Sequence, residues 1–484
     1  MEIAAQRSNI IYRPLGITLG ILTTVLFWWL FSSNPTTLAL LAIAALFLFG
    51  LKRPVWSIAA LLVAQLTVTS YMVSTPFGSI SLRLLLLILT LIVMFSAFTQ
   101  RQISLGSNTR RIFIPILILI SVSIISNVAN SEFDSTFRDF RNMLVGLMIV
   151  ILIPAATRNV KDLKILCGVS FIAIVASSLL GLMQHYQLFG MDQATLIPGY
   201  LELESENLRV PGMAETELEL AYVLATTILI VLSICLVKGV NSGNRKLLFL
   251  SMPLMTLTLY FTYTRSALFA LGLGLIALLL FLKTRIHGGI IISAFLLILI
   301  VIEMTGILGG LYIGGRPEIV QEESAVTRKI LWQSGIDIAL DNPILGIGVD
   351  NYGTISPEYS TSVDPSLLEW EEERYYEYST LGMGAIHNDF LYFWVSYGTP
   401  ALIVYIWLYV VILGNLLKSY RMSKTRFIKG LALGLAIALV AYGVNSFYHN
   451  LIATLSLFWT LVGLSLATTK LALNDKLPKR RLNM

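Results

Sequence analysis

Hydrophobic residues are grouped along this chain into runs that are long enough to cross a lipid bilayer. A helix needs about 20 consecutive apolar residues to cross a hydrocarbon core of about 30 Å, and the chain contains about fourteen such runs. The pattern predicts an all-α fold, a polytopic transmembrane helical bundle of about 12–14 spans. The expected spans are residues 15–33, 36–51, 56–73, 80–98, 112–128, 142–156, 163–183, 217–237, 246–263, 266–282, 288–305, 388–417, 428–446 and 451–469.

The first and twelfth runs carry additional signals. The run at 15–33 is longer than the apolar core of a secretory signal peptide and lacks a small-residue cleavage site, so we expect a first span there. The run at 388–417 is interrupted by Gly398-Thr399-Pro400. Because proline removes a helical hydrogen bond, we expect this span to begin as a half-helix or to bend there.

The charged residues predict which way the bundle faces. With the N-terminus in the cytoplasm, most of the 34 Lys and Arg residues fall in the inner loops, as the positive-inside rule requires. The acids in those loops are limited to Glu2, Asp162 and Asp475. The net charge of +6 therefore reflects a basic inner face and an acidic outer face, and it does not imply a nucleic-acid partner. We expect a multi-pass membrane protein with cytoplasmic N- and C-termini.

Composition excludes a soluble protein, because 56% of the residues are hydrophobic and only 13% are charged. Two long segments between spans, 184–216 and 306–386, lie on the expected outer side. They divide the remainder into N-terminal spans at 1–183, central spans at 217–305, C-terminal spans at 387–470 and a basic tail at 471–484. Within the second outer segment, residues 324–341 predict a helix that ends at Asn342-Pro343. This helix is apolar on two faces, which predicts that it is buried against the bundle or the membrane surface.

The pattern of possible ligands favours chemistry without a metal or cofactor. Cys167 and Cys235 both lie inside apolar runs and support neither a disulfide framework nor a zinc site. The acids of the outer segments are scattered, and His387 has no metal-ligand spacing around it. We therefore expect no metal and no cofactor.

Arg265 is the most informative basic residue on the outer side, where basic residues are scarce. It occurs in Tyr260-Phe-Thr-Tyr-Thr-Arg-Ser-Ala, where one span meets the next with almost no loop. A guanidinium beside the free N–H groups of a helix start can bind an anion, which predicts a phosphate or diphosphate site. The alternative is an arginine that extends to the membrane surface or forms an ion pair.

Two further outer residues are candidates for chemistry. Arg209 precedes a span that begins with Glu217 and Glu219, so a salt bridge is as good an interpretation as substrate binding. His387 follows a glycine-rich segment and precedes the polar pair Asn388-Asp389 at the mouth of the twelfth span. Its imidazole could take a proton from a sugar hydroxyl near neutral pH, or it could be an ordinary boundary histidine.

Taken together, these motifs resemble the O-antigen ligase/polymerase superfamily of bacterial polysaccharide enzymes. Each motif is weak alone, but their order, spacing and common outer location make the set fairly specific. The resemblance covers roughly residues 205–400, and the flanking spans match only in hydropathy and number. The matching segments are Leu208-Arg-Val-Pro-Gly, Phe261-Thr-Tyr-Thr-Arg-Ser-Ala, Arg328-Lys-Ile-Leu-Trp, Asp341-Asn-Pro-Ile-Leu-Gly-Ile-Gly and His387-Asn-Asp-Phe-Leu followed by Gly398.

The resemblance implies a metal-independent glycosyltransferase in the bacterial inner membrane. Its donor would be a glycan linked to undecaprenyl diphosphate, and its acceptor a hydroxyl of a glycan or of a lipid-A-core-type molecule. On this basis Arg265 and Arg209 would neutralise the diphosphate, and His387 would be the general base. Arg328 and Asn388 would also contact substrate. The expected number of spans exceeds the twelve that ligases of this family commonly have.

The sequence leaves the acceptor and one other class of function open. Ligase, repeat-unit polymerase and protein O-oligosaccharyltransferase would share the donor and differ only in acceptor. A flippase for the same lipids is a second class, but transporters usually contain repeated halves and charges near the midplane, and neither is visible here. A structural scaffold would leave the outer Arg and His residues unexplained.

Overall fold

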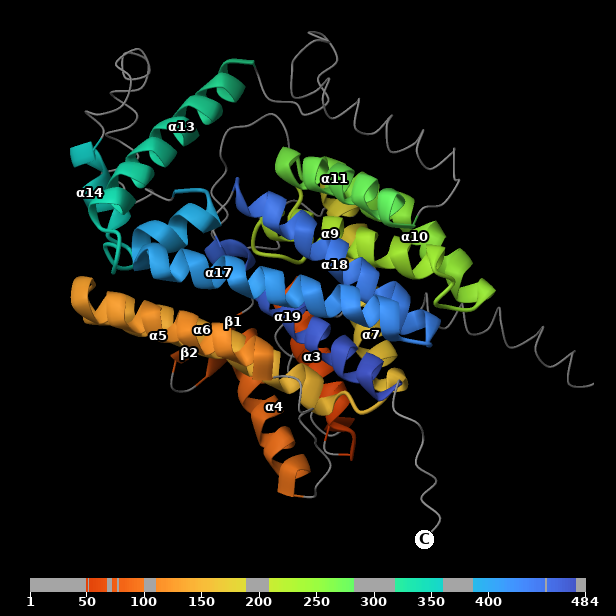
Figure 1. Ribbon diagram of the computed structural model, residues 1–484. Helices are drawn as coiled ribbons and strands as arrows, with labels where there is room; N and C mark the ends of the chain where they lie inside the picture. Colours follow the sequence, from red (N-terminus) through yellow and green to blue (C-terminus); the bar gives the residue numbers. More distant parts are fainter. Residues whose placement is uncertain are drawn as a thin grey trace, which may run out of the picture.

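The computed structural model shows a bundle of long helices (Figure 1) and describes residues 49–50, 52–67, 72–75, 78–99, 110–188, 209–282, 318–359, 386–448 and 451–475. The elements up to residue 188 are α3 (Pro54–Thr67), β1 (Met72–Thr75), β2 (Gly78–Ser81), α4 (Leu82–Thr99), α5 (Arg110–Asn130), α6 (Phe133–Ala156) and α7 (Val160–His185). The elements after residue 208 are α9 (Glu217–Leu236), α10 (Ser242–Phe261), α11 (Arg265–Leu282), α13 (Glu318–Asp341), α14 (Tyr352–Tyr359), α17 (Asp389–Met422), α18 (Arg426–Ser446) and α19 (Leu451–Asn474).

The all-α membrane fold expected from the sequence is confirmed. Among the described residues, seven helices are long and apolar enough to cross a membrane, namely α5, α6, α7, α9, α17, α18 and α19. The helices α3, α4 and α11 are shorter but also apolar. The expected spans at 15–33 and 288–305, and nearly all of 36–51, lie outside the described residues. Every other expected span coincides with a helix.

The helices α5, α6 and α17 run along a common direction, whereas α4 and α13 are inclined to it (Figure 1). This common direction gives the bundle two distinct ends. In Figure 1, α13, α14 and the turn between α5 and α6 lie at the left end, which we call the α13 end. The turn between α17 and α18 lies at the opposite end. The segment that contains α13 is the large outer segment predicted from the sequence, so the α13 end is the expected outer end.

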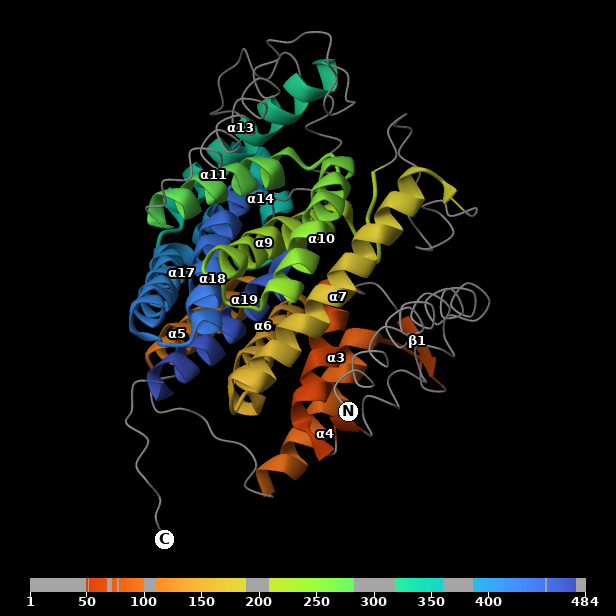
Figure 2. The same ribbon diagram turned by 90° about the vertical axis from the view of Figure 1, so that its right-hand side faces the viewer.

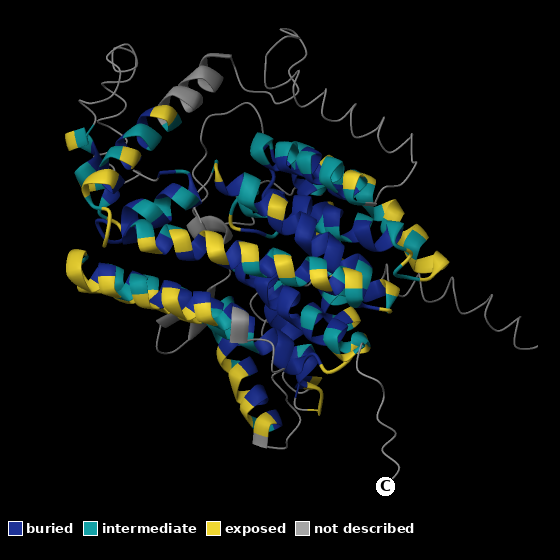
Figure 3. Cartoon of the chain, in the orientation of Figure 1, coloured by how far each residue is buried: buried dark blue, intermediate teal, exposed yellow. Residues whose placement is uncertain are grey.

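The centre of the bundle is formed by α18 and α9, which pack more extensively than any other described pair (Figure 2). In Figure 3, α18 is buried along nearly its whole length. Helices in a membrane associate by close packing, which small residues allow. A Cβ added at Gly430 would lie 2.8 Å from the Cα of Ile234, and one at Gly434 would lie 2.7 Å from the Cα of Ile230. The two glycines therefore set the α18–α9 distance.

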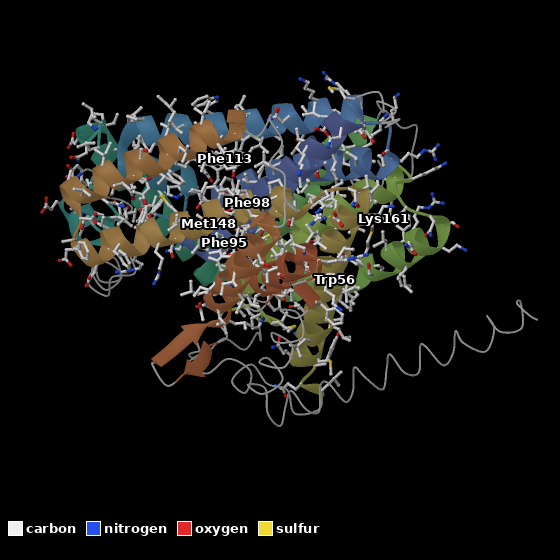
Figure 4. The ribbon with its side chains drawn as sticks, turned by 90° about the horizontal axis from the view of Figure 1, so that it is seen from below. Trp56, Phe95, Phe98, Phe113, Met148 and Lys161 are labelled. Atoms are coloured by element: carbon white, nitrogen blue, oxygen red, sulfur yellow. The ribbon has the colours of Figure 1, made fainter. Side chains whose placement is uncertain are left out.

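The outside of the bundle is apolar where lipid would contact it. Phe95 and Phe98 project from α4 with 71% and 68% of their surfaces exposed (Figure 4). Exposed side chains of this kind would be costly in water but are stable against hydrocarbon tails. The burial pattern therefore supports a membrane location independently of helix length.

Three boundaries differ from the sequence-based expectation. The span expected at 56–73 ends at Thr67 and is followed by an antiparallel hairpin that pairs Met72 with Ser81 and Thr75 with Gly78. The β-branched residues Val73, Thr75 and Ile80 in these strands favour an extended backbone. The helix expected at 142–156 begins at Phe133. Its first turns are polar, so the apolar run marks only the later part of the helix. The helix expected at 324–341 begins at Glu318.

The break expected in the twelfth span is confirmed at Gly398. Its backbone angles, φ 82° and ψ 176°, interrupt α17 and leave a half-helix over residues 389–397. The carbonyl groups at the end of this half-helix would lack partners in a membrane. The loop after α13 supplies them, because Ile347 N donates to Val395 O at 2.9 Å and Gly348 N donates to Ser396 O at 2.9 Å.

Candidate functional site

Arg265 lies at the start of a tight helical hairpin, as the sequence predicts. It is the first residue of α11, and only residues 262–264 separate it from α10. Tyr263 has a φ of 51°, an uncommon conformation for a residue other than glycine, and this reverses the chain. The Thr262 hydroxyl donates to Leu259 O at 2.6 Å and closes the end of α10. The guanidinium is thus attached to a helix start, where backbone N–H groups favour an anion.

A buried loop lies beside this hairpin and contains the Val-Pro-Gly motif. Gln184 of α7 holds Gly212 through two hydrogen bonds, accepting from its N at 2.9 Å and donating to its O at 3.0 Å. Met213 N donates to Ser177 Oγ at 3.0 Å. Gly212 has a φ of 60°, and an added Cβ would lie 2.7 Å from Ser177 O. The Val-Pro-Gly loop therefore packs against α7 so closely that position 212 has room only for glycine.

Arg209 lies at the start of the Val-Pro-Gly loop and next to the α10–α11 hairpin. Val210 N donates to Phe261 O at 3.4 Å, which brings the segment that carries Arg209 to the end of α10. Arg209 itself forms an ion pair with Glu217 of α9, with 2.6 Å between Nη1 and Oε1. The structure thus contains the salt bridge that was the alternative interpretation. A role of Arg209 in substrate binding stays a prediction.

The outer helix α13 is fastened directly to the segment that carries His387. Trp332 donates its indole N–H to Ile386 O at 3.0 Å. On the same helix, Ile330 and Leu331 are buried in a small apolar cluster together with Ile386. The helix therefore lies against the half-helix of α17, and it carries Arg328 one turn before Trp332.

Arg328 is placed among other groups of the candidate site. Partial burial lowers the pKa of its guanidinium. Tyr222 and Tyr448 act in the opposite direction, and the positive charge of Arg265 lowers the pKa further. Arg265 and Arg328 come from distant segments, yet they are close enough to repel each other. Two neighbouring guanidinium groups are the kind of arrangement that attracts an anion, and anion binding here stays a prediction.

His387 completes the cluster. Its φ of 50° is unusual for a residue with a side chain, and it lies between the Trp332 anchor point and the cap of α17. Partial burial lowers the pKa of the imidazole to about 4, and the positive charge of Arg328 contributes. The imidazole is therefore neutral at physiological pH and able to accept a proton.

One segment of the chain matches a known protein family. Residues 250–406 match the family model described as O-antigen ligase. This match supports the resemblance of the chain to the O-antigen ligase/polymerase superfamily. The matched segment includes Arg265, Arg328 and His387, whereas Arg209 precedes it. No curated protein matches the chain. The match is consistent with a glycosyltransferase-like activity on lipid-linked glycan substrates in a membrane.

The sequence reasoning missed two tyrosines of this candidate site. Tyr222 of α9 is hydrogen-bonded to Ser266, the neighbour of Arg265, and its hydroxyl donates to Asn445 O at 3.3 Å. Tyr448, which follows α18, lies close to Arg328. Tyrosines near the ends of membrane helices are common, so the sequence pattern contains no signal that would distinguish these residues.

Two motifs of the O-antigen ligase-family segment have a structural explanation. Asn388 caps α17, because its Oδ1 accepts from Leu391 N at 3.1 Å. In the Gly346-Ile-Gly loop, the N–H groups of Ile347 and Gly348 donate to Val395 O and Ser396 O at the break of α17. Asn388 was expected to contact substrate, and that role stays a prediction beside its capping role.

Metal ligands do not cluster in the part of the chain that the structure describes. No group of three or more His, Cys, Asp or Glu side chains there could hold a metal ion. The expected metal independence of the reaction stays a prediction.

Proposed function

We propose that the protein transfers an oligosaccharide or polysaccharide from undecaprenyl diphosphate to an acceptor hydroxyl, on the extracytoplasmic side of the bacterial inner membrane. The convergence of Arg265, Arg328 and His387 at the α13 end carries this proposal. A cationic cluster beside a neutral imidazole suits a reaction that releases a diphosphate and consumes a hydroxyl proton. The match to the O-antigen ligase family supports the same reaction class.

In the proposed reaction, the acceptor oxygen attacks the anomeric carbon of the donor glycan. A new glycosidic C–O bond forms, and the bond between the anomeric carbon and the diphosphate oxygen breaks. His387 accepts the proton of the acceptor hydroxyl. The electron pair of the broken bond leaves with undecaprenyl diphosphate, which Arg265 and Arg328 stabilise. Arg209 would join them if the diphosphate displaces its ion pair with Glu217. We propose that no metal takes part.

The proposal favours a ligase-like reaction, with repeat-unit polymerisation as the nearest alternative. Both reactions use the same donor and the same leaving group, so the cationic cluster serves either. They differ in the acceptor, which is a lipid-A-core-type molecule for a ligase and a second lipid-linked repeat unit for a polymerase.

A transfer assay tests the function and separates the alternatives. Purified full-length protein in liposomes receives undecaprenyl-diphosphate-linked oligosaccharide and one candidate acceptor at a time, and released undecaprenyl diphosphate is measured. We expect release that depends on one acceptor and falls about 100-fold or more in His387→Ala and in Arg265→Ala. The control is Lys329→Ala, an exposed neighbour of Arg328 on α13, which should retain activity. Movement of labelled lipid across the bilayer without release would instead identify a flippase.

A further inference from the structure

Two aromatic side chains flank the candidate site at the α13 end. They are Trp332 of α13 and Tyr448, which follows α18. Their ring centroids are 6.3 Å apart and their planes are inclined by 50°, so the rings form an open angle and are not stacked on each other. Both side chains are partly exposed, whereas Tyr405 and Tyr442 deeper in the bundle are fully buried.

The pair lies next to the groups that would carry out transfer. Trp332 follows Arg328 by four residues, which is about 6 Å along the helix axis and nearly the same helix face. Tyr448 is close to the Arg328 guanidinium. The indole N–H of Trp332 donates to Ile386 O, one residue before His387. Because that N–H is already used and the ring packs partly against the apolar cluster, Trp332 can offer a ligand only the exposed part of its ring surface.

We propose that Trp332 and Tyr448 form a subsite for the pyranose ring that is attached to the lipid diphosphate. A pyranose has faces of C–H groups and a rim of hydroxyl groups. The C–H faces match the negative faces of aromatic rings, and the hydroxyls match neighbouring polar groups. One helical turn separates the subsite from Arg328, a distance similar to the width of one sugar ring. The inference rests on the proposed function, because it takes the diphosphate to lie at Arg265 and Arg328.

The test compares two lipids on purified full-length protein in nanodiscs. One is undecaprenyl diphosphate, and the other is undecaprenyl diphosphate that carries a single N-acetylglucosamine. In the wild type we expect the sugar-bearing lipid to bind more tightly. Trp332→Leu and Tyr448→Leu should each weaken its binding by about 3- to 10-fold and leave binding of the sugar-free lipid unchanged.

Two variants separate sugar stacking from a structural effect. Trp332→Phe loses the hydrogen bond to Ile386 O but retains an aromatic face. Because the aromatic face binds the sugar in this proposal, the variant should keep most of the preference for the sugar-bearing lipid. Trp394→Leu is the matched control, because Trp394 packs on the same apolar cluster and donates to Thr399 Oγ1 at 3.0 Å. It should leave the preference unchanged.

The outcomes distinguish this inference from the proposed function. The subsite proposal would be overturned if Trp332→Leu and Tyr448→Leu kept the wild-type preference for the sugar-bearing lipid. Equal losses for both lipids would also overturn it, because they would indicate a structural role. A wild-type protein that binds neither lipid would contradict the proposed function itself, and the subsite with it.

Discussion

The Tyr397 hydroxyl of α17 donates a hydrogen bond of 2.9 Å to Oδ2 of Asp139 in α6. The same oxygen accepts from Nδ2 of Asn127 in α5 at 2.7 Å. Asn127 Oδ1 in turn accepts from Val349 N at 3.0 Å, in the loop after α13. A carboxylate in a membrane helix is costly unless it is hydrogen-bonded, so this network is a structural constraint. It joins α5, α6 and the outer loop to the half-helix that begins two residues after His387.

We expect Tyr397→Phe to destabilise the protein by about 1–3 kcal/mol, because the Asp139 carboxylate would lose a donor. The measurement is thermal or denaturant unfolding in detergent. The control is Tyr409→Phe, which removes a hydroxyl that is 3.4 Å from the Tyr405 hydroxyl. A bond between neutral groups is weaker, so its loss should cost less. Equal destabilisation by the two variants would contradict the importance of Asp139.

Gly346→Ala should separate the outer loop from the half-helix of α17. Gly346 has a φ of 63°, and an added Cβ would collide with Val395 O, the carbonyl group that accepts from Ile347 N. We expect a loss of more than about 1 kcal/mol in unfolding free energy, together with a lower transfer rate. Gly414→Ala is the control, because Gly414 lies inside α17 with no atom near the added Cβ. That variant should unfold no more easily than the wild type.

The pH dependence of transfer should report the charge of Arg328. Activity requires neutral His387, so kcat/KM should fall as the pH drops through the pKa of its imidazole, which is about 4 in the free protein. Arg328→Gln removes a positive charge that lowers this pKa, so the acid limb should move to higher pH. Arg328→Lys keeps the charge and should move it less. A limb that stays in place in Arg328→Gln would show that the two groups are not coupled.

The ion pair of Arg209 provides a test of its predicted role. If Arg209 binds the diphosphate, Glu217→Gln should release it and strengthen the binding of undecaprenyl diphosphate. If Arg209 only holds the Val-Pro-Gly loop in place, Glu217→Gln should lower the unfolding temperature and leave lipid affinity unchanged. Lipid binding and thermal unfolding measured on the same preparation distinguish the two. Arg209→Ala should weaken lipid binding only in the first case.

Chelation should not change the rate of transfer if arginines alone stabilise the diphosphate. The measurement is the transfer assay with and without an excess of EDTA, followed by addition of Mg²⁺ or Mn²⁺. A loss of activity that a divalent ion restores would contradict the metal-independent mechanism. In that case the diphosphate itself would contribute ligands to the ion.

The motifs were easier to predict than their geometry. The sequence indicated Arg265 at a hairpin, a break at Gly398 and a helix ending at Asp341, because each depends on local residue types and spacing. It did not indicate Tyr222, Trp332 or Tyr448 as neighbours of the site. Aromatic residues at helix ends and in apolar helices have many roles, and only contacts between distant segments select one of them.

The sequence by itself determined that the chain is a multi-pass helical membrane protein and which family it resembles. Both follow from local properties, since apolar length fixes a membrane helix and short motifs can be identified in order along the chain. The tertiary structure alone decided that Arg209 pairs with Glu217 and that α13 brings Arg328 to Arg265 and His387. These relationships join segments that are far apart in sequence. They depend on how helices pack, and hydropathy contains no information about that packing.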